Sequence, residues 1–215
     1  FFMFPFDIYT DTMISYLRYR GYAGARAGSF NATQSPEIED PLYLNFKAYS
    51  PQNSLRDLNS LADQAIQEKS WGIREVHGVN DASWGKISLR DYEAHMKYLQ
   101  ALSRSDSLWV GTLSDVLTYE MLRKKYTPIV TQTDEHHQAA KIEFTAEPFS
   151  PEDSLIWSAA SASTKFHTVT LVLAQHKHKI SKIMQEDKKL AFRKKGEKIL
   201  VDVNPAKGAL TLIYK

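Results

Sequence analysis

The feature that most constrains the fold is a change of hydrophobic period partway along the chain. Residues 1–126 alternate short apolar stretches with amphipathic helical patterns, whereas the period after Tyr126–Pro128 is two. Strand followed by helix, repeated, indicates parallel strands joined by crossover helices, and strict alternation indicates half-buried strands. The sequence therefore predicts an α/β domain over residues 1–126 and a separate all-β domain over residues 127–215.

The first domain is expected to contain short buried strands and longer amphipathic helices. The strands are predicted at Phe2–Phe6, Tyr22–Ala27, Leu42–Tyr49, Trp71–His77 and Ser107–Gly111. The helices are predicted at Asp11–Arg20, Leu55–Glu68, Leu89–Leu102 and Leu113–Lys125. A closed (β/α) barrel needs roughly 250 residues, about twice what is present here. Because the chain also opens on an apolar run that resembles an interrupted strand, we expect part of a barrel, with a further segment upstream.

The sequence predicts that the second domain is a small β-sandwich. Alternating stretches occur at Lys141–Glu147, Thr168–Ala174, Lys179–Gln185, Lys198–Val203 and Ala209–Tyr214. Turn signals rich in Pro, Gly and Asn separate them, as expected for antiparallel strands. Several short strands over this length favour a sandwich of the immunoglobulin or fibronectin type.

Charge and composition exclude several classes of function. The formal net charge is only +2, which gives no electrostatic case for nucleic acid binding. No apolar run approaches the length of a membrane span, and the absence of cysteine excludes disulfides and thiol chemistry. No Gly-rich phosphate loop, serine-hydrolase elbow or His-Glu-x-x-His motif occurs.

The candidate site residues follow from the rule that an α/β barrel places its active site at the carboxyl ends of its strands. His77 ends a predicted strand and could act as a general acid. Asp7 and Arg26 end two other strands and could bind a sugar hydroxyl or a carboxylate. Trp84 lies in the loop after His77 and could form a wall on which a sugar stacks. For each residue a structural role is the competing interpretation.

Two other groups of histidines carry weaker signals. His95 lies on a predicted helix and is expected at the surface or in a second layer around the site. His176 and His178 alternate on one side of a strand pattern, but no cysteine or carboxylate accompanies them, so exposed strand positions are the preferred interpretation.

Several spaced segments resemble one family. Phe2-Met-Phe-Pro-Phe-Asp7 and Gly21-Tyr-Ala-Gly-Ala-Arg26 are similar to the later part of the polysaccharide deacetylase domain, carbohydrate esterase family 4. Trp71-Gly-Ile-Arg-Glu-Val-His77-Gly, and Leu108-Trp-Val-Gly-Thr112 followed by Tyr119, are similar to its last strands and helices. The resemblance covers roughly residues 1–125, and the region from about Ala140 resembles the β-sandwich appended to some bacterial members.

This resemblance implies a fold and an activity. The fold would be the C-terminal half of a deacetylase-type (β/α) barrel, followed by the sandwich. The activity would be removal of acetyl groups from a carbohydrate polymer by a secreted or periplasmic protein. A divalent metal, often zinc, would polarise the acetyl group, and His77 matches the late histidine that protonates the leaving group.

The chain also departs from the family pattern. The Asp-Asp and His-x-x-x-His motifs that hold the metal do not occur, so the ligands are expected outside this chain, in an upstream segment. Met3 occupies the position of a usual arginine. The alternative is a non-catalytic carbohydrate-binding or scaffold relative with a decayed barrel. A third interpretation, a glycosidase with paired carboxylates, would use Glu75 and Asp81 beside His77.

Overall fold

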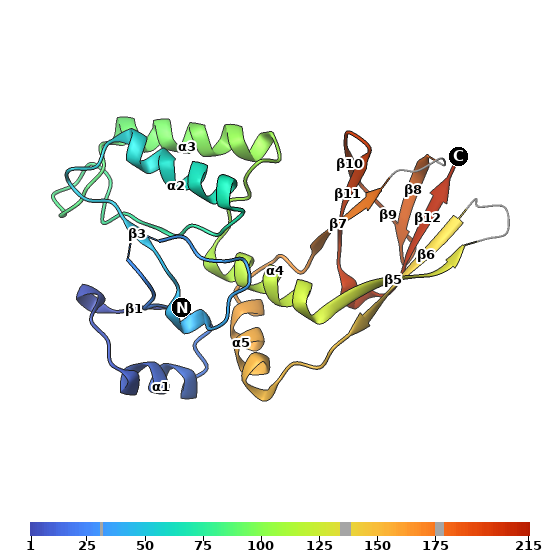
Figure 1. Cartoon of the computed structure of the whole chain (residues 1–215), viewed down its shortest axis with the longest axis horizontal. Coiled ribbons are helices and arrows are strands. Elements are labelled where there is room, and N and C mark those ends of the chain that lie inside the picture. The colour runs from blue at the N-terminus through green and yellow to red at the C-terminus, as the bar shows by residue number, and fades with distance from the viewer. Residues whose placement is uncertain (31, 134–138, 175–178) are drawn as a thin grey trace. The chain divides into compact units, whose positions relative to one another are not determined.

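The chain divides into two compact units, which are described separately. The computed structural model describes residues 1–30, 32–133, 139–174 and 179–215. The first unit comprises Phe1–Ser114 and the second Asp115–Lys215 (Figure 1). The division lies one helix before the expected boundary near Thr127. The reason is that Leu122, on the intervening helix, belongs to the apolar core of the second unit.

Short parallel strands form the centre of the first unit. They are β1 (Phe2–Met3), β2 (Ala25–Arg26), β3 (Lys47–Ala48) and β4 (Arg74–Glu75). β1 pairs with β2 and β3 pairs with β4, both in parallel. Backbone hydrogen bonds from Leu44 N to Ala25 O (2.9 Å) and from Gly28 N to Leu44 O (3.1 Å) connect the two pairs. The carboxyl ends of these strands therefore lie at one edge.

The helices of the first unit begin at the residues that the sequence predicts. They are α1 (Asp11–Tyr19), α2 (Leu55–Glu68) and α3 (Leu89–Arg104). Each begins after a Ser or Thr whose hydroxyl accepts a hydrogen bond from a backbone N–H of the first turn: Thr10, Ser54 and Ser88. In Figure 1, α2 and α3 lie together on one side of the strands and α1 lies on the other. This βαβ arrangement positions the loops at the carboxyl edge of the strands.

Three predicted strands of the first unit differ from the structure. The strand predicted at Leu42–Tyr49 begins as the 3-10 turn η2 (Pro41–Tyr43), where Asp40 Oδ1 accepts from Leu42 N (2.9 Å), and only Lys47–Ala48 forms a strand. The strand predicted at Phe2–Phe6 ends at Met3, because Pro5 has no N–H to continue a ladder and begins the 3-10 turn η1 (Pro5–Asp7). The segment Ser107–Gly111 is not a strand. Ser107 N and Leu108 N both donate to Leu102 O, so the segment closes the end of α3 instead.

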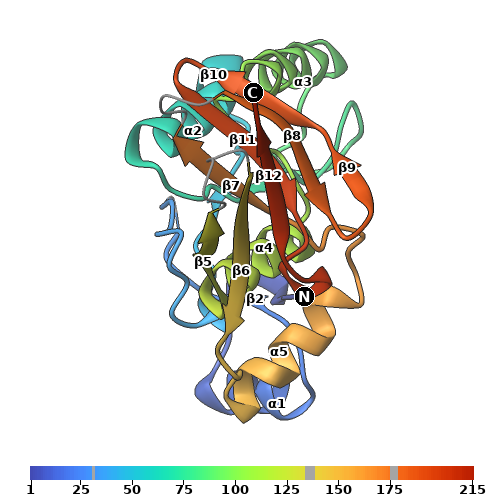
Figure 2. The same cartoon turned by 90° about the vertical axis from the view of Figure 1, so that its right-hand side faces the viewer.

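The second unit consists of two antiparallel sheets around one apolar core (Figure 2). One sheet has the order β5-β6-β12-β8-β9 and the other β10-β11-β7. The strands are β5 (Tyr126–Thr133), β6 (Ala139–Ala146), β7 (Val169–Ala174), β8 (Ile180–Gln185), β9 (Lys188–Leu190), β10 (Phe192–Lys195), β11 (Lys198–Val203) and β12 (Leu210–Tyr214). Ile183 and Leu210 of the first sheet join Ile199 and Val201 of the second in the core.

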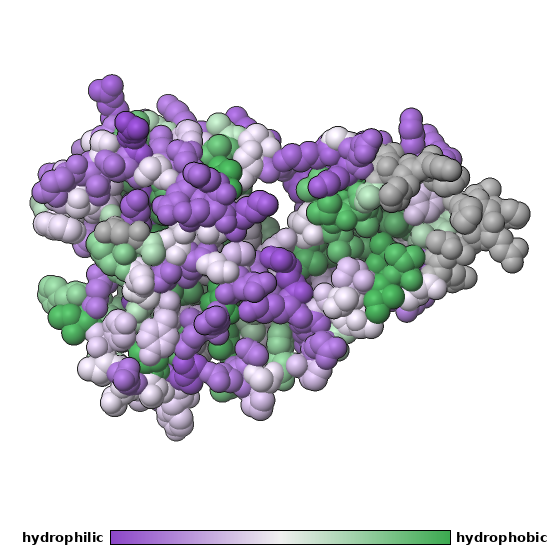
Figure 3. Space-filling view, viewed as in Figure 1, coloured by the Kyte–Doolittle hydropathy of each residue, from purple (hydrophilic) through white to green (hydrophobic). Residues whose placement is uncertain are grey.

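One of the two helices that follow the first unit was not predicted. α4 (Leu113–Lys125) matches its predicted span, whereas α5 (Pro151–Ser161) lies where a turn was expected. Ser150 caps α5 and Pro151 occupies its first turn, a combination that starts helices as well as turns. Apolar side chains are exposed on the face of this unit seen in Figure 3, and Ile129, Val130 and Val172 are exposed on the edge strands β5 and β7.

Among the helices of the described ranges, none is both long enough and apolar enough to cross a bilayer.

Candidate functional site

Arg26 joins two of the strand ends at the carboxyl edge of the first unit. Its Nη2 lies 2.6 Å from Asp7 Oδ1, and its Nη1 lies 2.6 Å from Glu75 Oε1. The side chains of Arg26 and Glu75 are only 11% and 16% exposed, whereas Asp7 is more open to solvent. One guanidinium therefore bridges two carboxylates, one that follows β1 and one that ends β4.

The guanidinium of Arg26 also packs against an aromatic ring. Its Cζ lies 4.4 Å from the ring centroid of Phe46, which is buried, so a cation–π contact adds to the two ion pairs. Arg26 Nε is buried and has no hydrogen-bond partner among the described residues. Since a buried charge needs partners to offset its desolvation, the ion pairs and the ring together fix this side chain.

His77 lies close to Glu75 and contacts Trp84. Its Nε2 lies 3.7 Å from Glu75 Oε1, and its ring is partly exposed. The rings of His77 and Trp84 meet edge to face, with centroids 5.1 Å apart and an interplanar angle of 84°. Trp84 itself is 62% exposed. The imidazole thus lies between a carboxylate and an indole, with part of its surface open to a ligand.

The loop between His77 and α3 is held by its own hydrogen bonds. Asp81 accepts from Ser83 Oγ (2.6 Å) and Ser83 N (2.9 Å), and these bonds lower the pKa of the Asp81 carboxyl. Asn80 N donates to Ile87 O (2.8 Å) and Ile87 N donates to Gly78 O (3.0 Å), and these two bonds close the base of the loop. A Cβ on Gly78 would lie 2.0 Å from Asp81 Oδ2, so a side chain at this position would displace the Asp81 carboxylate.

Gly85 lies on the Nδ1 side of the His77 imidazole, opposite the nitrogen that approaches Glu75. Its φ of +67° favours glycine, and an added Cβ would lie 2.6 Å from Tyr49 O and 3.4 Å from His77 Nδ1. The backbone at Gly85 is therefore close to the nitrogen of His77 that faces away from Glu75. Any side chain at this position would clash with the carbonyl oxygen of Tyr49.

The turn that carries Asp7 has an unusual backbone. Phe6 and Asp7 both have positive φ, 55° and 56°, in the left-handed region that bulky residues rarely adopt. Asp7 N donates to Phe4 O (3.1 Å) and Ile8 N to Pro5 O (3.3 Å), which closes the turn. This geometry directs the Asp7 carboxylate to Arg26 and leaves the Phe6 ring in solvent.

The four predicted site residues therefore lie at one edge and are linked in space. Asp7 contacts Arg26, Arg26 contacts Glu75, and Glu75 approaches His77, which touches Trp84. Glu75 was considered only for the glycosidase interpretation and not for the deacetylase site, because its direction along the strand was uncertain. Its spacing of two from His77 was the available signal, since residues i and i+2 of a strand share a face.

The remaining histidines lie elsewhere. His95 is buried, and its Nδ1 is 2.8 Å from Asn59 Oδ1, so it joins α3 to α2 rather than facing the site. His176 and His178 lie outside the described residues.

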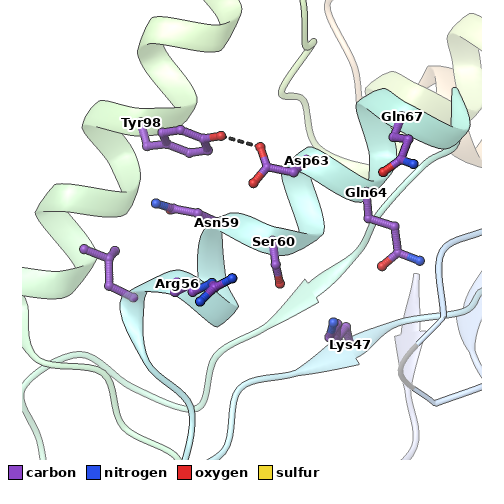
Figure 4. Close-up of a pocket in the computed structure, with 9 residues that line it drawn as sticks. Lys47, Arg56, Asn59, Ser60, Asp63, Gln64, Gln67 and Tyr98 are labelled. Carbon is purple, nitrogen blue, oxygen red and sulfur yellow. Dashed lines mark hydrogen bonds between the residues drawn. The ribbon is translucent and has the colours of Figure 1, made fainter.

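A separate polar groove runs along α2 (Figure 4). Its volume is about 760 Å³, and Tyr98 on α3 donates a hydrogen bond to Asp63 on α2 across it. The lining residues are Lys47, Leu55, Arg56, Asn59, Ser60, Asp63, Gln64, Gln67 and Tyr98. Most of the polar lining residues lie on the solvent-facing side of the amphipathic helix α2, and this position explains their polarity without a binding function. The predicted site residues do not line this groove.

The residues of the site do not fit a metal ion. Within the described ranges, no group of three or more His, Asp or Glu side chains is arranged to hold one. Asp7 and Glu75 are instead both paired with the cation of Arg26. The metal ligands expected outside this chain stay a prediction.

Comparison with known proteins gives no family assignment. No protein-family model matches the chain, and no curated protein is similar to it. The assignment of a function therefore depends on the residues and the geometry described above, and it is made as a proposal.

Proposed function

We propose that this chain belongs to a metal-dependent carbohydrate deacetylase, in which it supplies the proton donor and part of the sugar-binding cleft. The parallel βαβ elements would be part of a (β/α) barrel, and the second unit an appended sandwich. The metal would be held by residues outside this chain. Action on a carbohydrate polymer would place the protein in a secreted or periplasmic setting.

The observation that carries the proposal is the position of His77. It follows β4 at the carboxyl edge, 3.7 Å from a carboxylate and in contact with an exposed indole. Histidine is the side chain suited to donating a proton near neutral pH. When the acetyl C–N or C–O bond breaks, the imidazolium would give its proton to the leaving nitrogen or oxygen.

The other residues of the edge would position this group and the sugar. Arg26 fixes Glu75 through a short ion pair, and Glu75 in turn limits the orientations of the His77 ring. Trp84 offers an apolar surface on which the C–H face of a pyranose can stack. These roles explain why an ion cluster lies beside exposed aromatic rings at a strand edge.

The test is acetate release by the full-length protein from acetylated chitin, peptidoglycan and xylan. His77→Ala should lower the rate by about 10²-fold or more, the usual contribution of a general acid, without changing the unfolding curve. The matched control is His167→Ala, a partly exposed histidine of the second unit. Turnover that is unchanged in His77→Ala would remove His77 from the mechanism.

A non-catalytic carbohydrate-binding protein is the second candidate. The exposure of Trp84 and Phe6 beside the ion cluster favours it, because stacking requires no proton transfer. This candidate predicts that oligosaccharides bind while no acetylated polymer releases acetate. A glycosidase with Glu75 and Asp81 has less support, since Glu75 is paired with Arg26 and Asp81 with Ser83.

A further inference from the structure

We infer that the second unit is a dimerisation module, in which the free edge of β7 pairs with the same strand of a second copy of this chain. The two three-stranded sheets would then form one continuous antiparallel sheet across a two-fold axis. The residues of this edge all lie in the second unit, so the dimer can be tested independently of the carbohydrate function proposed above.

Three of the four edge strands described in this unit carry features that discourage pairing with another chain. Such features are lysines, prolines and bulges, which natural proteins place on sheet edges because unpaired N–H and C=O groups attract other strands. β9 carries Lys188 and Lys189, and positions 193–195 of β10 are all basic. β5 contains Pro128, which has no N–H, and its pairing with β6 shifts register after Val130. These three edges are therefore protected.

β7 (Val169–Ala174) is the fourth edge strand, and it has none of these features. Its sequence, Val-Thr-Leu-Val-Leu-Ala, contains no charged residue and no proline, and its pairing with β11 runs without a register shift. Within the described residues, β7 pairs with β11 alone. Val172 is 57% exposed, and the apolar surface of this unit in Figure 3 extends over β7. β7 is therefore the edge at which another strand can pair.

A strand beside β7 would also complete the apolar core of the second unit. Val169 is buried in the core, and Leu171 and Leu173, which lie on the same face, pack against it but are only partly buried. β7 ends its sheet, so no strand of the described residues lies beyond it in that sheet to cover the two leucines. Burial of such apolar surface is the main favourable contribution to association.

The charge distribution of the unit favours a second copy as the source of that strand. Identical copies present identical charges to each other, so a shared edge that carries lysines is disfavoured. At the β10–β11 hairpin, for example, Lys195 and Lys198 already lie opposite each other. β7 carries no charge, so two copies can meet there without opposing like charges.

The sequence of β7 is also compatible with pairing to itself. A two-fold axis perpendicular to the sheet keeps the core face of both copies on the same side. Antiparallel pairing centred on Leu171 then places Val169 opposite Leu173 on the core face, and Thr170 opposite Val172 on the outer face. Every pair is uncharged and consists of β-branched or leucine side chains, which stabilise cross-strand contacts.

The experiment measures the mass of the full-length protein by sedimentation equilibrium from about 1 μM to about 1 mM, the range in which weak specific complexes dissociate. Val172→Lys puts a charge on the exposed outer face of β7, and two-fold pairing brings the two new lysines to diagonal positions. Val172→Thr is the conservative variant, since it keeps a β-branched, uncharged side chain. Val130→Lys is the matched control, because Val130 is 63% exposed on the protected edge strand β5.

The wild-type mass should rise with concentration toward twice the monomer mass. Val172→Lys should raise the dissociation constant by about tenfold or more, whereas Val172→Thr and Val130→Lys should change it by less than about threefold. A protein that stays monomeric over the whole range, including one whose β7 edge binds a strand of a different protein, overturns the inference. So does a dimer that Val172→Lys leaves intact or that Val130→Lys weakens as strongly.

Hydrogen exchange tests the same edge without a substitution. In the dimer, amide hydrogens of β7 that point away from β11 become bonded to the second copy, so they should exchange more slowly at the highest concentration than at the lowest. The amides of β10 are the internal control, since β10 remains an outer strand of the joined sheet. Equal exchange of β7 at both concentrations would show that this strand does not form the interface.

Discussion

Arg26 and Glu75, which end neighbouring parallel strand pairs, form an ion pair of 2.6 Å with both side chains largely shielded from water. The pair brings together residues 49 positions apart in the sequence and fixes the carboxylate that approaches His77. It is the central contact of the candidate site, because Asp7 on one side and His77 on the other are positioned through it.

Loss of the Arg26 cation should destabilise the first unit. Arg26→Met would leave the carboxylate of Glu75 buried without a partner, which costs about 3 kcal/mol for pairs of this type. Urea unfolding of the variant gives the change directly. Lys141→Met is the control, because Lys141 and its partner Glu143 are 45% and 46% exposed, so loss of this pair should cost less than about 1 kcal/mol.

A second variant tests whether the unpaired charge is the cause. Arg26→Met combined with Glu75→Leu should recover part of the stability, since neither charge then remains. If the single and double variants unfold alike, or if Arg26→Met costs no more than Lys141→Met, the ion pair does not organise this edge.

The sequence predicted helices better than strands, for physical reasons. Ser54 and an amphipathic pattern define α2, and its predicted and observed bounds agree. The parallel strands are only two residues long, so alternation over them is too short to assign a face. α5 was missed because Ser150 and Pro151 start turns and helices alike, and only packing of the following residues decides between them.

The candidate site was partly accessible from the sequence. The rule that parallel strands end at one edge was enough to propose Asp7, Arg26, His77 and Trp84 together. The contacts between them were not accessible, because Arg26 and Asp7 are joined by the turn geometry of a strained backbone. The roles of these four residues stay predictions until they are measured.

The stability of the first unit should depend on pH through His95. Burial, and then the charge of Arg74, lower the pKa of His95 below its ordinary value. The folded state therefore binds the proton less readily than the unfolded state. The stabilising contribution is complete above the unfolded pKa, about 6.5, and is lost as pH falls through the folded pKa.

Unfolding free energies at pH 7.5 and 5.5 test this dependence. The wild-type protein should lose stability with a slope of at most about 1.4 kcal/mol per pH unit from this one group. His95→Gln removes the titrating group and should flatten the slope between these two pH values. An equal slope in both proteins would show that His95 is not responsible.

A buried amide should be essential to the second unit. Gln185 Nε2 donates to Asn204 O (2.7 Å) and Gly208 O (3.0 Å), and Asn204 N donates to Gln185 Oε1 (3.2 Å). Gln185→Leu would leave these backbone groups unpaired, at a cost of about 1–3 kcal/mol or more. The same measurement on Ile183→Val, a nearby core change that removes one methyl group and no hydrogen bond, should show about 1 kcal/mol.

Glu75→Gln tests whether the carboxylate beside His77 assists proton donation. The substitution keeps the size of the side chain and removes the carboxylate charge that lies 3.7 Å from His77 Nε2. If Glu75 orients His77 as the proton donor, acetate release by the variant should be slower than release by the wild-type protein, because the imidazole ring is held less firmly in its reactive position. Asp81→Asn is the control, because Asp81 lies in the following loop and is bonded to Ser83. A rate that responds equally to both substitutions would mean that Glu75 holds Arg26 and has no part in the chemistry of His77.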